Sequence, residues 1–200
     1  MTIRSGQLAA CLLLWTAIIC WPQVSASKSS KSQAAAADRF QQKLEHLRAN
    51  GLQAHPDQAP TVFPEDELNA YFAARRVALP AGLKSVQFVI TQGALQSALT
   101  VDFDQLTANA RSSNPLLSIF SGVHDVKVKA HGEGSGGVAR AHVDSVSLDG
   151  SELPRFMLEL FVDKFLKPKY PNASLDPTFK LPEKIDLLTL GEHKATVTQK

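Results

Sequence analysis

Residues 153–166 read LPRFMLELFVDKFL, and this stretch decides the fold. Pro154 suits a first helical turn, and Arg155, Glu159 and Asp163 recur every four residues, so the pattern predicts a helix with one polar stripe. Apolar side chains occupy most of the remaining circumference. At 100° per residue the apolar arc covers about 240°, whereas a surface helix buries a stripe of ~100°. We therefore expect a hydrophobic helix that is covered on most of its sides.

Stretches of alternating polarity on both sides of this helix predict antiparallel hairpins. They cover residues 86–103, residues 126–143 with a turn over 131–137, and residues 185–197. After Val143 the apolar phase shifts by one residue, which is what a β-bulge produces. A short helix is expected over residues 114–122, capped by Asn114. Because no strand–helix crossover pattern repeats, the element order predicts an α+β fold with an antiparallel sheet.

The N-terminal segment has the three parts of a cleavable export signal. Arg4 supplies a positive charge, an uncharged apolar run covers residues 8–20, and Val24-Ser25-Ala26 offers a small-x-small cleavage site. The run is shorter than the roughly 20 residues that span a bilayer, so an uncleaved membrane anchor is the weaker alternative. Lipidation at Cys20 is another alternative, disfavoured by the bulky residue before it. We expect residues 1–26 to be a signal peptide and the protein to be exported, most simply to a bacterial periplasm.

The rest of the chain divides into two predicted parts. Residues 27–37 read SKSSKSQAAAA and predict a tether, since none of these side chains is a large apolar group. Phe40, Leu44 and Leu47 then follow helical spacing, which predicts an N-terminal amphipathic helix over residues 34–50. With a proline-containing linker, these elements make up residues 27–60. Residues 61–200 are predicted to form one α+β domain.

Charge and cysteine content exclude several classes of function. The predicted signal contains both cysteines and one of the 21 basic residues, so the mature chain has no thiol and a formal charge of about +1. A near-neutral chain without a basic run predicts no nucleic-acid partner. A glycine-rich segment over residues 132–137 precedes a strand rather than a helix, so we interpret it as a hairpin turn and not as a phosphate loop.

Candidate catalytic and metal-binding side chains are scattered. His124, His131 and His142 could approach one another around one hairpin, but they lack metal-ligand spacing and are expected to be ordinary surface or core residues. Three carboxylates lie at the polar positions of predicted strands: Asp102, Asp104 and Asp144. A solvent-exposed face of the sheet accounts for them, so no catalytic role is assigned. The sequence therefore predicts no catalytic site, no metal site and no cofactor.

The hydrophobic helix has more apolar surface than one face of a sheet can bury. One interpretation is a central core helix in a fully packed interior. The other is that part of this surface faces the first hairpin across a groove for an acyl chain. The side chains expected to line that groove are Phe88, Ile90, Val101, Phe103, Phe156, Met157, Leu160, Phe161 and Phe165.

Four short motifs mark the starts and ends of the predicted elements. They are FPEDELN at residues 63–69, VSLDG at 146–150, the Leu153-Pro154 pair, and LPEKI at 181–185. Together they resemble exported bacterial phospholipid-binding proteins of the tubular lipid-binding (TULIP) superfamily, over about residues 61–200. The resemblance implies a curved antiparallel sheet wrapped around a hydrophobic helix, with an apolar channel for lipid.

These expectations combine into a non-catalytic function. We expect binding or transfer of a lipid or another apolar ligand in the cell envelope, with a lipid, a membrane surface or another envelope protein as the partner. The alternative is an envelope interaction or scaffold module with a fully packed core and no ligand.

Overall fold

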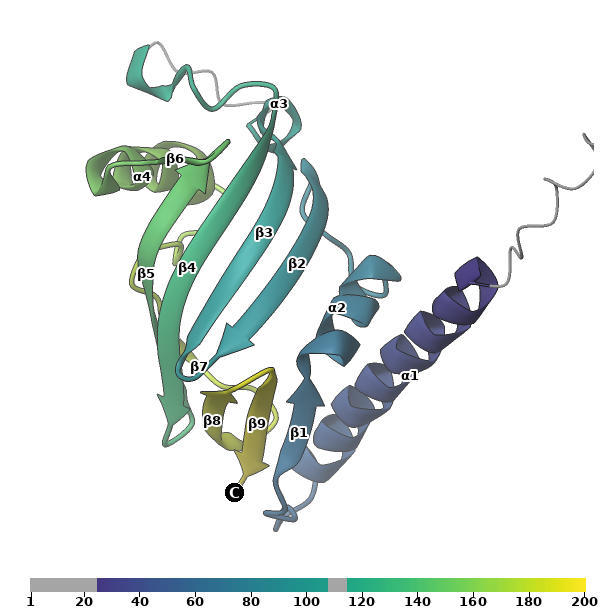
Figure 1. Ribbon diagram of the computed structural model, residues 1–200. Helices are drawn as coiled ribbons and strands as arrows, with labels where there is room; N and C mark the ends of the chain where they lie inside the picture. Colours follow the sequence, from purple (N-terminus) through teal and green to yellow (C-terminus); the bar gives the residue numbers. More distant parts are fainter. Residues whose placement is uncertain (1–24, 108–114) are drawn as a thin grey trace, which may run out of the picture. The chain divides into compact units, whose positions relative to one another are not determined.

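The computed structural model describes residues 25–107 and 115–200 (Figure 1). The predicted signal up to residue 24, and Asn114 as a helix cap, lie outside the described residues. The chain divides into two compact units, residues 1–32 and residues 33–200. The described part of the first unit, residues 25–32, is helical and belongs to α1 (Ser25–Gly51). Among the described residues, no helix combines the length and apolar character needed to cross a membrane.

The described residues contain nine strands in one antiparallel sheet, so the predicted α+β class with an antiparallel sheet is confirmed. The strands are β1 (Thr61–Pro64), β2 (Leu83–Thr91), β3 (Ala94–Asp102), β4 (Val123–Ser135), β5 (Val138–Leu148), β6 (Ser151–Glu152), β7 (Thr178–Lys180), β8 (Ile185–Gly191) and β9 (Lys194–Gln199). Their hydrogen-bonded order is β1-β9-β8-β4-β3-β2, and β5 pairs with β4, β6 and β7. Figure 1 shows β2 to β5 side by side as the long strands of the sheet, with β2 at an edge.

The three predicted hairpins are present as β2–β3, β4–β5 and β8–β9. The turn of the second is shorter than predicted, because β4 continues to Ser135 and only Gly136 and Gly137 form the loop. Both glycines have positive φ angles, 62° and 76°, as a two-residue hairpin loop requires. The earlier glycines serve close packing instead: a Cβ on Gly132 would lie 2.7 Å from the carbonyl oxygen of Arg140.

The predicted β-bulge is confirmed in β5. The register passes from Ala130↔Val143 to Lys129↔Ser145, so Asp144 is the extra residue. A bulge bends its strand and increases the local twist. It also places two consecutive side chains on the same face of β5. As a result, Val146 points to the apolar side of the sheet, as Val143 does.

The predicted hydrophobic helix is confirmed as α4 (Arg155–Phe161), followed directly by a π-helical turn, η2 (Val162–Leu166). The widened turn is visible in the bond from the Lys167 amide to the Val162 carbonyl oxygen, at 2.9 Å. Two short elements accompany it, α3 (Phe103–Leu106) and η1 (Pro115–Leu117). Phe103 was predicted to extend a strand, but Asp102 caps a helix there, its carboxylate accepting the Gln105 amide at 3.1 Å.

One hydrophobic core lies where these helices meet β3, β4 and β5. Its buried members come from the sheet (Val101, Val126), from α3 (Phe103), from η1 and the residues after it (Leu117, Phe120) and from η2 (Phe165). Partly buried apolar residues of α4 and β5 pack against it. The helical segments α3, η1 and α4–η2 therefore cover the same region of the sheet.

A second core joins α1 to α2 (Glu65–Ala73), β1 and β9. Phe40 and Leu47 of α1 pack with Phe63 and Val197, and β1 pairs with β9. The compact unit accordingly begins at Gln33, whereas the sequence predicted a domain boundary at Thr61.

The tether predicted for residues 27–37 is wrong, because these residues are helical. Alanine is the best helix former, and Ala36 and Ala37 are buried against Ala70 of α2. Small side chains here permit close contact between the two helices, so the absence of large apolar groups does not indicate a solvated segment.

Candidate apolar binding site

An apolar cavity of about 300 Å³ lies between the sheet and the α4–η2 helix. Its sheet wall comes from alternate residues of three adjacent strands: Leu99, Val101, Val126, Val128, Val143, Val146 and Leu148. Because side chains alternate across a strand, the bulge at Asp144 is what keeps both Val143 and Val146 on this wall.

The helical wall is built around three aromatic rings. The centroid of Phe103 lies 5.4 Å from that of Phe120 and 5.7 Å from that of Phe161, and Phe120 and Phe161 are 4.4 Å apart. Leu158 and Val162 add aliphatic surface. Among the described lining residues, Ser174 is the polar one. Binding in this cavity would therefore be driven almost entirely by dispersion contacts and by the removal of apolar surface from water.

Three of the nine predicted lining residues, Val101, Phe103 and Phe161, line this cavity. Phe165 and Leu160 belong to the same core without lining the cavity, while Met157 is partly buried and Phe156 is 52% exposed. The helix therefore buries a narrower face than its composition suggests.

Phe88 and Ile90 lie elsewhere. The Phe88 ring packs on Phe72 of α2 at 5.1 Å between centroids, and Ile90 is 1% exposed with its amide donating to Glu65 at 2.6 Å. Phe88 and Ile90 are two residues apart on β2, and strand alternation predicts that they lie on the same face of the sheet. It does not predict how far along the strand the cavity lies, so the alternation alone places them with the cavity residues.

The sequence does not predict one segment of the cavity wall, which contains Ser174 and Leu175. Ser174 and Leu175 belong to a stretch without a periodic pattern, so no local signal marks them. The segment runs along β5: the Val143 amide donates to the Leu175 carbonyl at 2.9 Å, and the Ala141 amide to the Pro177 carbonyl at 3.1 Å. Pairing with a distant strand thus supplies this part of the wall.

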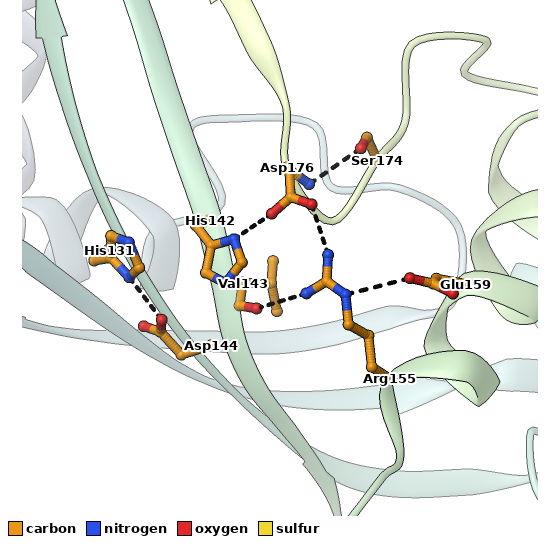
Figure 2. Close-up of polar contacts among 8 residues, drawn as sticks. All are labelled: His131, His142, Val143, Asp144, Arg155, Glu159, Ser174 and Asp176. Carbon is orange, nitrogen blue, oxygen red and sulfur yellow. Dashed lines mark hydrogen bonds and ion pairs between the residues drawn. The ribbon is translucent and has the colours of Figure 1, made fainter.

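A polar hollow of about 270 Å³ adjoins the cavity, and the two share Val162, Ser174 and Leu175 in their linings. Figure 2 shows the Arg155 guanidinium there, donating to Asp176 at 2.6 Å and pairing with Glu159 at 3.2 Å. These ion pairs fasten the segment that carries Ser174 to α4. The cavity is therefore apolar inside and bordered by paired charges.

Three histidines outside the cavity each bond to a carboxylate, and one of these carboxylates, Asp176, also binds Arg155. His124 bonds to Asp149 at 2.6 Å and to the Ser121 carbonyl at 2.6 Å, and these contacts raise the pKa of His124 above its usual value. His131 bonds to Asp144, and His142 to Asp176 (Figure 2). Within the described residues, no group of three or more His, Cys, Asp or Glu side chains is arranged to hold a metal ion.

The described residues thus form an apolar cavity that is partly open to the surface, together with several exposed ion pairs. Comparisons with protein-family models, with curated proteins and with solved structures found no match.

Proposed function

We propose that this protein is a non-catalytic binder or carrier of a lipid acyl chain in the bacterial cell envelope. The observation that carries the proposal is the apolar cavity between β3–β5 and α4–η2. Its volume of about 300 Å³ is at the lower end of the range of small-molecule sites. Each methylene group moved from water into such a cavity contributes about 0.8 kcal/mol, so a partly buried chain already gives useful affinity.

The cavity volume favours one chain over two. At ~30 Å³ for a water-sized group, about ten such groups fit into it. A single acyl chain, or the first part of one, matches this capacity. The polar end of the ligand would then lie at the adjoining polar hollow, where Ser174 belongs to both linings.

The proposal includes the finer architecture implied by the TULIP resemblance, a curved sheet wrapped around the hydrophobic helix. Two features support it: the bulge at Asp144, which bends β5, and the packing of α4–η2 on three adjacent strands. An export signal over residues 1–26 would place this domain beside envelope membranes. The cavity favours ligand binding over the alternative scaffold module, whose core would be fully packed.

The test is to fill the cavity without breaking the fold. Val146→Phe adds a ring to the sheet wall, and Val89→Phe makes the same change at an exposed position of β2. Lauroyl lysophosphatidylethanolamine should raise the melting temperature of the wild-type protein and of Val89→Phe, but not of Val146→Phe. Native mass spectrometry should show the same pattern of bound lipid. If the wild-type protein gains neither bound lipid nor melting temperature, the proposed function is wrong.

A further inference from the structure

Two histidines face each other on adjacent strands outside the apolar cavity. His131 of β4 and His142 of β5 are directly opposite in the antiparallel ladder, and their ring centroids are 5.0 Å apart. Both line a separate hollow of about 470 Å³ beside the β2–β3 turn. Their side chains are 58% and 44% exposed, so solutes can reach both rings.

Each ring is held at the same nitrogen by a carboxylate. Nδ1 of His131 lies 2.6 Å from Asp144, and Nδ1 of His142 bonds to Asp176 (Figure 2). A carboxylate at Nδ1 favours the proton on that nitrogen, which leaves Nε2 of a neutral ring with a free lone pair. Within the described residues, neither Nε2 has a hydrogen-bond partner. A carboxylate behind the ring and a free nitrogen in front is the arrangement that orients metal-bound histidines.

The spacing of the rings fits a shared metal ion. A metal bonded at about 2.1 Å to a ring nitrogen lies about 3.3 Å from the ring centroid, so two ligands that subtend about 90–109° have centroids about 4.6–5.3 Å apart. The observed separation of 5.0 Å falls inside this range. The ring planes are inclined at 42° to each other.

We propose that His131 and His142 form a two-histidine clamp for a divalent transition-metal ion, with Nε2 of each ring as the ligand. Imidazole nitrogens suit Zn²⁺, Cu²⁺ and Ni²⁺, whereas Mg²⁺ and Ca²⁺ need oxygen ligands. Water fills the remaining coordination positions. Asp144 and Asp176 are positioning residues, since they hold the rings and do not bind the ion.

The β-bulge is part of this site. Asp144 is the extra residue of β5, and a bulge re-aims the side chain that it carries. The Asp144 carboxylate therefore reaches His131 on the neighbouring strand. Asp176 reaches His142 from the segment paired along the opposite edge of β5. The two carboxylates thus support the clamp from different parts of the chain.

Calorimetric titration of the untagged full chain with Ni²⁺ tests the proposal. One equivalent should bind, and His131→Gln or His142→Gln should weaken binding at least about tenfold, because one of two ligands is lost. Asp144→Asn should weaken it by about tenfold while both rings remain, as expected for an outer-shell partner. His193→Gln, at an exposed turn outside the clamp, should bind as the wild-type protein does.

The glutamine variants keep side-chain size and hydrogen bonding, and their melting temperatures show whether they are folded. The proposal is overturned if the wild-type protein takes up no Ni²⁺, or if the double variant His131→Gln/His142→Gln binds as tightly as the wild type. It is overturned for Asp144 alone if Asp144→Asn changes the melting temperature but not the affinity for Ni²⁺.

Discussion

At the residue scale, Glu67 is a buried carboxylate that joins two helices. It is 4% exposed in α2 and accepts Arg39 at 2.8 Å and Lys43 at 2.5 Å, both from α1. Burial alone would raise the pKa of Glu67, but the bonds and charges of Lys43 and Arg39 outweigh it, so the net pKa lies below its usual value. The contribution to stability is therefore present near neutral pH and is lost as pH falls through that lowered pKa.

We expect Glu67→Gln to lower the free energy of unfolding by about 1–3 kcal/mol, because a neutral amide leaves two cations with a weaker acceptor. Urea denaturation at pH 7 measures the change. Glu45→Gln is the matched control, since Glu45 is exposed on α1 and should shift stability by less than about 0.5 kcal/mol. Equal effects of the two substitutions would contradict the role assigned to Glu67.

The His124–Asp149 pair predicts a pH dependence of stability. Bonding to Asp149 and to the Ser121 carbonyl raises the pKa of His124, and the His124 ring with the Asp125 amide lowers the pKa of Asp149. The histidine's contribution is complete below about pH 6.5 and is lost as pH rises through its raised pKa. The carboxylate's contribution is complete above about pH 3.9 and is lost as pH falls.

The stability difference between wild type and His124→Gln should therefore be largest between about pH 4 and 6.5 and should shrink as the solution becomes alkaline. Thermal denaturation across this range measures it. His46→Gln, at an exposed position of α1, is the matched control for the histidine-to-glutamine change itself. A difference that grows above pH 7 would be inconsistent with the raised pKa of His124.

At the element scale, the bulge in β5 makes a specific prediction about deletions. Removing Asp144 leaves Val143 paired with Ala130 and Ser145 paired with Lys129, so the inward residues Val143 and Val146 keep their face. We expect this deletion to cost only about 1 kcal/mol, the upper value for the exposed ion pair with His131 that it removes.

Deleting Ser147 instead shifts Leu148 to the opposite face, because side chains alternate with a period of two. The loss of this partly buried leucine adds destabilisation of up to about 1.5–3 kcal/mol, the range for a fully buried side chain. Urea denaturation of the two deletion variants compares them directly. If deleting Asp144 is as damaging as deleting Ser147, the register around the bulge differs from the one described.

The same elements show what the sequence can and cannot predict. Hairpins such as β4–β5 are predictable because alternation, glycine turns and even the bulge are local patterns. The short strands β1 and β7 are not, because each is defined by a partner far along the chain, β9 and β5 respectively. The same limit explains the candidate site: Val101, Phe103 and Phe161 were predicted to line it, but Leu175 depends on pairing with a distant strand.

At the scale of the whole domain, the described part of residues 33–200 has two separate aromatic cores on one sheet, besides the small alanine cluster between α1 and α2. The first includes Phe103, Phe165 and the cavity, and the second joins α1 to β1, α2 and β9 through Phe40 and Phe63. The second core has no part in the lining of the cavity. Stability and ligand binding should therefore respond to different substitutions.

Phe40 tests this separation, since it is 7% exposed and its ring lies 5.1 Å from Phe63 and 4.8 Å from Tyr71. Phe40→Ala should lower the free energy of unfolding by about 3–5 kcal/mol, the usual cost of removing a buried ring. Below its melting temperature, it should bind lauroyl lysophosphatidylethanolamine as the wild type does, whereas Val146→Phe should lose binding at nearly unchanged stability. Calorimetry and urea denaturation measure both quantities. If Phe40→Ala weakens lipid binding as much as Val146→Phe, the two cores are coupled through the sheet, and α1 would be part of the binding unit.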